Sequence, residues 1–307
     1  MGKTIGFAAI LIGFAWWALG AGAASPSARP TLQPSAQPTT QPSAQPATQP
    51  PTQPTTQPST QPAKQLFLDL GNKVSMKLVL IPAGKFTMGS PRTEKDRSND
   101  ETPRREVTIS KPFYMSVYEV TQAQYQQVMG TNPSNVTDKT HPVDRVSWND
   151  AVEFCGKLSR KTGKTVRLPT EAEWEYACRA GSTTRFYYGD DPDYSQLADY
   201  AWYSTDNDSR THPVGLKKPN AWGLYDMHGN VWEWCSDRHA SSYARAGTLD
   251  PQGPDSGQYR VLRGGGWSYG AFSCRSAYRL RGSQAVPYDL NGIRAAVSVP
   301  AGQAGSE

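Results

Sequence analysis

The stretch Arg263-Gly264-Gly265-Gly266-Trp267-Ser268-Tyr269-Gly270-Ala271-Phe272-Ser273-Cys274-Arg275-Ser276-Ala277-Tyr278-Arg279 lies near the C-terminal end of a chain of 307 residues. Its consecutive glycines allow the backbone to approach a neighbouring backbone or a ligand closely, because glycine has no Cβ. A cysteine beside arginines is either a reactive thiolate, favoured by nearby positive charge, or one half of a disulfide. Which of these Cys274 is decides much of what the protein can do.

The overall composition excludes few functions. The net charge is +5, and no Lys/Arg cluster with interleaved aromatic residues is present, so nucleic acid is not an expected partner. Residues 65–300 are long enough for one sizeable core, and residues 301–307 form a short tail.

The first 24 residues have the pattern of an export signal. Lys3 supplies the positive charge, Ile5 to Leu19 the apolar region, and Gly20 to Ala24 the small residues of a cleavage site. The alternative is an uncleaved N-terminal membrane anchor. Either one predicts an exported protein, in the periplasm, secreted or at the cell surface, where disulfides can form.

Residues 25–64 are rich in Pro, Gln and Thr, with Gln-Pro recurring every four residues from Gln33 to Gln61. Such a segment cannot bury a core, and its proline content favours an extended polyproline II conformation. We expect a disordered linker that holds the folded domain away from a membrane or cell wall.

Short strands are predicted at the start of the folded part. They are Lys77–Ile81, Lys85–Gly89, Glu106–Ile109 and Phe113–Met115. Pro82-Ala83-Gly84 has the composition of a turn, so the first two strands are predicted to form a hairpin.

Three helices are predicted from their N-terminal capping residues. Thr121 begins the helix Gln122–Met129, Ser147 begins the second, and Thr170 with Glu173 forms a capping box for the third. Two cysteines, Cys155 and Cys178, fall on the apolar faces of the second and third helices. Each is either a core residue, a disulfide partner or a reactive thiol.

Other polar residues have simpler explanations. The four histidines do not have the spacing of zinc ligands. Three glutamates at the start of the third helix, at positions 171, 173 and 175, are explained by capping and the helix dipole. Five arginines either line a groove for an acidic ligand or pair with carboxylates and carbonyls; they are Arg263, Arg275, Arg279, Arg281 and Arg294.

Six motifs of the folded part match a known family in order. They are Gly84-Lys85-Phe86-Thr87-Met88-Gly89-Ser90, Tyr118-Glu119-Val120-Thr121, Pro142-Val143-Asp144-Arg145-Val146-Ser147-Trp148, Arg167-Leu168-Pro169-Thr170-Glu171-Ala172-Glu173-Trp174-Glu175-Tyr176-Ala177, Gly229-Asn230-Val231-Trp232-Glu233-Trp234 and Arg263-Gly264-Gly265. The chain resembles the formylglycine-generating enzyme, or sulfatase-modifying factor, family over residues 75–298. The resemblance implies a mixed α/β (α+β) fold with a C-type-lectin-like core and little regular secondary structure.

The resemblance also implies a site. In the enzymes, two cysteines five residues apart bind copper(I), where oxygen is activated to oxidise a sulfatase cysteine to formylglycine. The second cysteine corresponds to Cys274, and the first corresponds to Tyr269, so the chain resembles the subgroup that lacks the first copper-binding cysteine. Cys274 would carry the reactive sulfur, with Trp267 and Tyr269 as the walls of its pocket. Copper(I) prefers two soft thiolates, so a copper site would need a second cysteine.

The missing sulfur has one candidate in the sequence. Cys235 follows the Trp-Glu-Trp motif, and we expect it to share a disulfide or a copper site with Cys274. Two family disulfide positions match Cys155 and Cys178, but their usual partners fall on Ala295 and Arg279. A bridge between Cys155 and Cys178 is the remaining possibility.

Calcium is the second ion that the resemblance implies. One structural Ca²⁺ would be held by the side chains of Asp226 and Glu233 and by the carbonyls of Gly229 and Val231. A second would correspond to Asp199, Tyr200, Asp206 and Asp208.

Two functions follow from these expectations. The first is an oxygen-dependent oxidase acting on an exported protein such as a sulfatase. The second is a non-catalytic, lectin-like module that binds a glycan or protein at the cell surface. The tyrosine at position 269 and the proline-rich linker favour the second, and family membership favours the first.

Overall fold

The computed structural model describes residues 64–205, 210–244 and 246–300. The predicted export signal, nearly all of the predicted linker and the tail lie outside the described residues, as do Asp206 and Asp208. Among the described residues, no helix is both long and apolar enough to cross a membrane.

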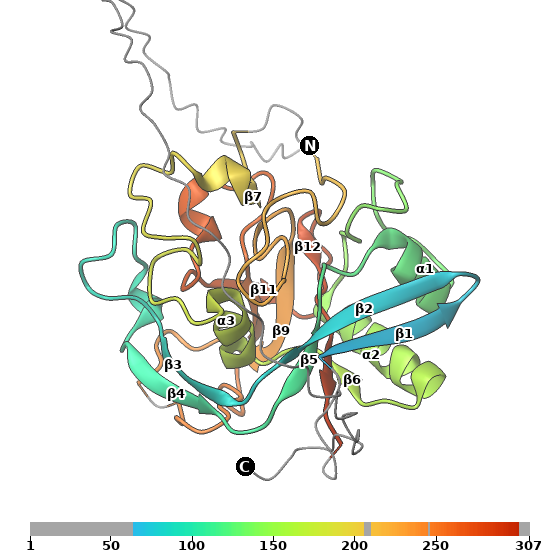
Figure 1. The fold of residues 1–307 in the computed structure, drawn as a ribbon, viewed down its shortest axis with the longest axis horizontal. Coiled ribbons are helices and arrows are strands. Elements are labelled where there is room, and N and C mark those ends of the chain that lie inside the picture. The colour runs from blue at the N-terminus through green and yellow to red at the C-terminus, as the bar shows by residue number, and fades with distance from the viewer. Residues whose placement is uncertain (1–63, 206–209, 245, 301–307) are drawn as a thin grey trace, which may run out of the picture. The chain divides into compact units, whose positions relative to one another are not determined.

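The largest sheet has five antiparallel strands in the order β1-β2-β5-β13-β6 (Figure 1). Their bounds are β1 Gln65–Gly71, β2 Val74–Ile81, β5 Phe113–Ser116, β13 Ala296–Ser298 and β6 Val166–Arg167. Strands from the two ends of the described domain therefore lie in one sheet, with β13 between β5 and β6.

A second sheet is formed by four strands from the C-terminal half of the chain, in the order β11-β10-β9-β12. Its strands are β9 Trp232–Arg238, β10 Tyr259–Arg263, β11 Leu280–Ser283 and β12 Asn291–Gly292. Two smaller pairs complete the strands, namely β3 Gly84–Met88 with β4 Arg105–Ile109, and β7 Ala201–Trp202 with β8 His228–Gly229.

All four predicted strands are present, but the predicted hairpin is wrong. Both edges of β2 are already paired, one with β1 and the other with β5, so the next strand has no edge to join. The chain instead crosses to a separate sheet, where β3 pairs with β4. The first hairpin is β1–β2, whose turn places Asn72 and Lys73 at positive φ, as in the turns that favour tight hairpins.

The three helices begin where their caps predicted. They are α1 Gln122–Met129, α2 Trp148–Thr162 and α3 Glu171–Arg179, with complete capping boxes at Thr121, Ser147 and Thr170. Each box satisfies backbone N–H groups that a helix N-terminus otherwise leaves unpaired. The described residues also include three short 3₁₀ turns: η1 Asn99–Glu101, η2 Leu197–Asp199 and η3 Ala271–Cys274.

The core consists of three clusters of buried side chains. One packs α2 against the large sheet and includes Trp232 and Trp234 of β9. Another packs α3 with Trp174 against β3, β4 and β10. The third is small and holds Cys274 among Phe186, Leu197, Ala201 and Tyr203.

Candidate functional site

Residues 263–279 connect β10 to the start of β11, and their three arginines are buried. The Arg263 guanidinium donates to Glu175 of α3 and to the backbone carbonyl of Tyr278. Arg279 donates to both oxygens of Glu171 at 2.5 and 2.9 Å. Burial alone would raise the pKa of Glu171, but Arg279 and Arg263 outweigh burial and lower it.

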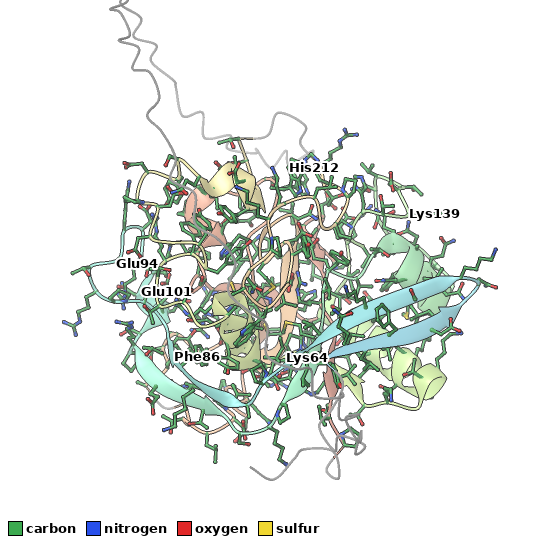
Figure 2. The ribbon with its side chains drawn as sticks, viewed as in Figure 1. Lys64, Phe86, Glu94, Glu101, Lys139 and His212 are labelled. Carbon is green, nitrogen blue, oxygen red and sulfur yellow. The ribbon has the colours of Figure 1, made fainter. Side chains whose placement is uncertain are left out.

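The third arginine anchors a distant loop. Arg275 donates to Glu101 at 2.6 and 2.9 Å and to Glu94 at 2.6 Å. Figure 2 shows these two glutamates close together in the segment before β4. Arg294, near the C-terminal end, is likewise buried against Glu233.

These contacts decide between the two interpretations of the arginines. Arg263, Arg275, Arg279 and Arg294 pair with carboxylates and carbonyls, and Arg281 alone of the five is exposed. The explanation of Glu171 and Glu175 by capping and the helix dipole is incomplete: Glu171 and Glu173 lie in the first turn of α3, and both Glu171 and Glu175 are buried ion-pair partners. Only Glu173 closes the capping box.

The consecutive glycines bring this stretch against its neighbours. Gly264 and Gly265 have positive φ values of 101° and 87°. A Cβ on Gly265 would lie 2.8 Å from the sulfur of Cys274, and one on Gly266 would lie 3.1 Å from the Trp232 ring. Cys274 is therefore covered by backbone and fully buried.

Tyr269 belongs to the same loop but lines a cavity. Its ring stands perpendicular to the indole of Trp232, with ring centres 5.2 Å apart. The cavity has a volume of about 450 Å³ and is formed by β10, β11 and the segment before β12. Its lining includes Tyr259, Tyr269, Arg281, Tyr288 and Asn291.

The predicted catalytic residues do not all line this cavity. Of the three, Tyr269 lines the cavity, whereas neither Cys274 nor Trp267 is part of its lining. Trp267 is half-buried, and its backbone N–H donates to Asn230.

The predicted disulfides are wrong for this structure, because all four cysteines are buried thiols. Cys235 packs with α3 in one core cluster, whereas Cys274 belongs to another. Burial raises the pKa of Cys155 and Cys178 to about 12 and raises the pKa of Cys235 well above its usual range. These three thiols are therefore protonated at neutral pH.

This donor set does not fit the two-sulfur copper site of the enzymes. The position of the first sulfur holds the phenol of Tyr269, which lines the cavity. The sulfur of Cys274 is covered by Gly265, and Cys235 is a protonated thiol in a different cluster. A two-sulfur copper(I) site needs a pair of thiolate ligands, and the residues present do not supply such a pair.

The predicted calcium loop fits its cation better than the predicted copper site fits copper(I). Asp226 sits at positive φ, and its Oδ2 accepts from the N–H of Gly215 at 2.7 Å. Its Oδ1 is buried and has no hydrogen-bond partner among the described residues. Burial, with the negative charge of Glu233 nearby, raises the pKa of Asp226 to about 6. A cation at Oδ1 would satisfy this oxygen.

Two further residues surround that loop. Glu119 is buried and accepts from Asn230 and from the backbone N–H of Val231. Burial, with the negative charges of Asp226 and Glu233, raises the pKa of Glu119 well above its usual range. Arg294 pairs with this group of three carboxylates through Glu233, at 2.7 Å. A buried excess of negative charge is costly unless it is protonated or balanced by a cation. Within the described residues, no three His, Cys, Asp or Glu side chains are close enough to share one metal ion, so Gly229 and Val231 carbonyls would have to complete such a site.

Two residues of the second predicted calcium site are described, and both have other contacts. Asp199 accepts from the exposed Lys218 at 2.7 Å. Tyr200 stacks on Tyr188 with ring centres 3.9 Å apart. The other two predicted ligands lie outside the described residues.

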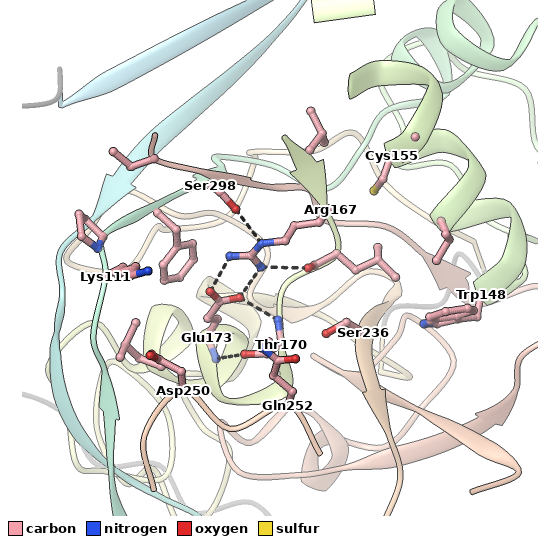
Figure 3. A pocket seen from close by; sticks show the side chains of 18 residues that line it. Lys111, Trp148, Cys155, Arg167, Thr170, Glu173, Ser236, Asp250, Gln252 and Ser298 are labelled. Carbon is pink, nitrogen blue, oxygen red and sulfur yellow. Dashed lines mark hydrogen bonds and ion pairs between the residues drawn. The ribbon is translucent and has the colours of Figure 1, made fainter. Parts of the chain in front are cut away.

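A larger cavity, of about 610 Å³, lies between α2, β5 and β13 (Figure 3). Figure 3 shows Arg167 inside it, held by Glu173 at 2.6 and 2.7 Å and by Ser298 at 3.1 Å. Its Asp250 accepts from the N–H and hydroxyl of Ser110. Arg167, Glu173 and Asp250 thus already have partners in this cavity, whereas the Nδ2 of Asn291 in the Tyr269 cavity has none among the described residues.

The sequence interpretation missed several residues of these sites. Glu119 belongs to the motif Tyr118-Glu119-Val120-Thr121, but only the fold brings it to the calcium loop. It accepts from the N–H of Val231, which lies 112 residues further along the sequence. Tyr259 reaches the Tyr269 cavity from β10, and Tyr288 and Asn291 reach it from β12 and the segment that leads into it; no local pattern marks them.

Comparisons with known proteins agree with this arrangement. The sequence profile of the sulfatase-modifying factor enzyme 1-like domain matches residues 69–299. The chain is 32% identical to the formylglycine-generating enzyme of Mus musculus over 267 residues, which covers 67% of this chain and 68% of the relative. It is 31% identical to the chaperone protein LppX of Paenibacillus barcinonensis, with coverage of 72% and 86%.

Two solved structures have the same fold. Treponema denticola variable protein 1 superposes with a TM-score of 0.70 at 30% identity, covering 78% of this chain and all of that one. PvdO from Pseudomonas aeruginosa superposes with a TM-score of 0.69 at 32% identity, covering 76% and 98%. The predicted fold, of the formylglycine-generating type with a C-type-lectin-like core, is confirmed. The chain belongs to the family of proteins with a sulfatase-modifying factor enzyme 1-like domain.

Proposed function

We propose that this domain is a non-catalytic ligand-binding module whose binding site is the cavity at Tyr269. The observation that carries the proposal is that Tyr269 lines the cavity whereas Cys274 does not. The first lines an open cavity, and the second is buried under Gly265 in a hydrophobic cluster. A cavity that is lined by exposed aromatic residues and holds no reactive group is suited to binding a ligand without changing it chemically.

Two further parts of the proposal come from the sequence. The N-terminal 24 residues support export, and residues 25–64 support display of the domain on a proline-rich stalk. One structural Ca²⁺ would be held by Asp226 and the carbonyls of Gly229 and Val231, with Glu233 shared with Arg294. When bound, the ion supplies positive charge beside three buried carboxylates, those of Asp226, Glu233 and Glu119.

The second candidate is the oxidation of a cysteine in an exported protein such as a sulfatase, which family membership favours. The test is to incubate the purified protein with copper(I), a reductant, oxygen and a Cys-x-Pro-x-Arg peptide. Mass spectrometry of the peptide then detects loss of the thiol. We expect no conversion by the wild type, and conversion would contradict the proposal. Conversion only by Tyr269→Cys would attribute the lost chemistry to this one position.

A further inference from the structure

The cavity at Tyr269 presents aromatic faces to solvent. Tyr259 and Tyr288 are 41% and 50% exposed, although both are large and largely apolar. The aliphatic residues Leu280, Pro287 and Leu290 complete the lining between them. Exposed aromatic residues gathered in one concave site are typical of binding surfaces.

One polar group in this cavity lacks a partner. Asn291 is only 3% exposed, and its Nδ2 is buried without a hydrogen-bond acceptor among the described residues. Its backbone, in β12, pairs with Trp232 of β9, and its N–H donates to the carbonyl of Tyr288. A buried amide donor of this kind calls for an acceptor, such as a peptide carbonyl, from a ligand.

The two charged residues that line the cavity, Arg281 and Asp289, have opposite signs and so do not favour a ligand of either charge. The Arg281 guanidinium lies 5.2 Å from the centre of the Tyr259 ring, which it can stack against. Asp289 is paired with Arg145 at 3.2 Å. What remains for a ligand is a set of tyrosine rings and one amide donor.

We propose that this cavity binds an uncharged proline-rich peptide in the polyproline II conformation, supplied by the Gln-Pro repeat of a second copy of the chain. The proposal rests on the proposed ligand-binding function. A polyproline II helix has no internal hydrogen bonds, so its carbonyls are available to a donor such as Asn291. Its proline rings pack on aromatic side chains, and its preformed shape lowers the entropy lost on binding.

The chain itself carries a segment with these properties. Residues 31–63 contain no charged side chain, and Pro51-Thr52-Gln53-Pro54 places two prolines three residues apart. With three residues per turn, both prolines would project from the same side of a polyproline II helix. A domain exported on such a stalk would meet the stalks of neighbouring copies.

The test is a fluorescence anisotropy titration of the full-length protein into a labelled peptide with the sequence of residues 45–58. We expect saturable binding to the wild type. Tyr288→Ala should weaken it by about tenfold or more, as expected for a central aromatic contact. Asn291→Asp, which replaces the donor with an acceptor, should also weaken it. The protein's own repeats compete equally in every variant.

Two controls distinguish specific binding from non-specific binding. Phe67→Ala removes an aromatic residue that is 61% exposed on β1, outside the cavity, and should leave the affinity unchanged. A peptide with Pro51→Ala and Pro54→Ala should bind about tenfold more weakly or worse. Equal binding of the original peptide to wild type and Tyr288→Ala, or no saturable binding, would overturn the proposal.

A second probe distinguishes this proposal from the function on which it rests. Maltohexaose, a neutral oligosaccharide, is titrated into wild type and Tyr288→Ala. If the sugar binds only the wild type and the peptide does not bind, the cavity is a ligand site but the polyproline assignment is wrong. If the wild type converts the sulfatase peptide in the copper assay, the ligand-binding function fails independently of either titration.

Discussion

Gly265 lies directly against Cys274: a Cβ on the glycine would be 2.8 Å from the cysteine sulfur and 3.1 Å from its Cα. The glycine also has a φ of 87°, a backbone conformation that residues other than glycine rarely adopt. This contact buries the thiol, whereas Tyr269 in the same loop lines a cavity. The stretch 263–279 is thus a packed structural element that the ion pairs of its arginines hold in place. Only at Tyr269 does it contribute to the proposed binding surface.

Substitution of Gly265 tests this packing. Gly265→Ala should destabilise the protein through both its positive φ and a clash with Cys274. Gly223→Ala is a matched control, because Gly223 has a φ of 77° but no neighbouring atom within 4 Å of the place where a Cβ would stand. The control should cost about 1 kcal/mol in free energy of unfolding, and Gly265→Ala clearly more. Equal losses in urea denaturation would mean that the contact is not close.

Calcium at Asp226 predicts a chelator effect. EDTA should lower the melting temperature of the wild type, and added Ca²⁺ should restore it. Asp226→Asn should lower the melting temperature without chelator and remove the response to EDTA. Asp199→Asn, at the surface pair with Lys218, should leave the response intact. A wild type indifferent to EDTA would rule out the ion at this loop.

Asp237 predicts a pH dependence of stability. Burial, followed by repulsion from Glu171, raises the pKa of Asp237 from 3.8 to about 7. Between these values the folded protein holds a proton that the unfolded chain has released, so this group's contribution to stability falls as pH rises toward 7. Asp237→Asn removes the titration and keeps an oxygen to accept from the N–H of Glu171.

The measurement is urea unfolding at pH 5 and pH 8. The stability of Asp237→Asn relative to the wild type should be greater at pH 8, by about 1.4 kcal/mol for each pKa unit of the shift within that window. Asp255→Asn, at an exposed position, should show the same difference from wild type at both pH values. A pH-independent difference for Asp237→Asn would contradict the raised pKa.

The buried ion pairs predict a large effect of losing one partner. Arg279→Met leaves the buried carboxylate of Glu171 without its bidentate partner. Breaking a buried pair in this way costs about 3–5 kcal/mol in free energy of unfolding. Arg281→Met, two residues away and exposed, should cost less than about 1 kcal/mol. Chemical denaturation of the two variants compares them directly, and similar losses would argue against the buried network.

Local features of the fold were predictable from the sequence. Thr121, Ser147 and Thr170 each begin a helix because a side-chain oxygen followed three residues later by Gln, Asp or Glu satisfies the first backbone N–H groups. Strand pairing was not, because it depends on which sheet edge is free. The chain after Ile81 leaves β2 for that reason.

The site was predictable only where family motifs coincide with it. Tyr269 was predicted as a wall of the Cys274 pocket, and it lines a cavity that does not include Cys274, because Cys274 is buried against Gly265. Glu119 and Asn291 take their roles from residues far away in the sequence. Such roles follow from tertiary packing and leave no periodic or local signal.

Copper(I) affinity tests the central claim most directly. Wild type and Cys274→Ser are titrated under anaerobic conditions against copper(I) held by bicinchoninate, whose absorbance falls when a protein thiolate removes the metal. With Cys274 covered by Gly265 and a tyrosine at position 269, neither protein should take up copper(I), and their titrations should superimpose. One equivalent of copper(I) bound by the wild type and lost in Cys274→Ser would contradict the account.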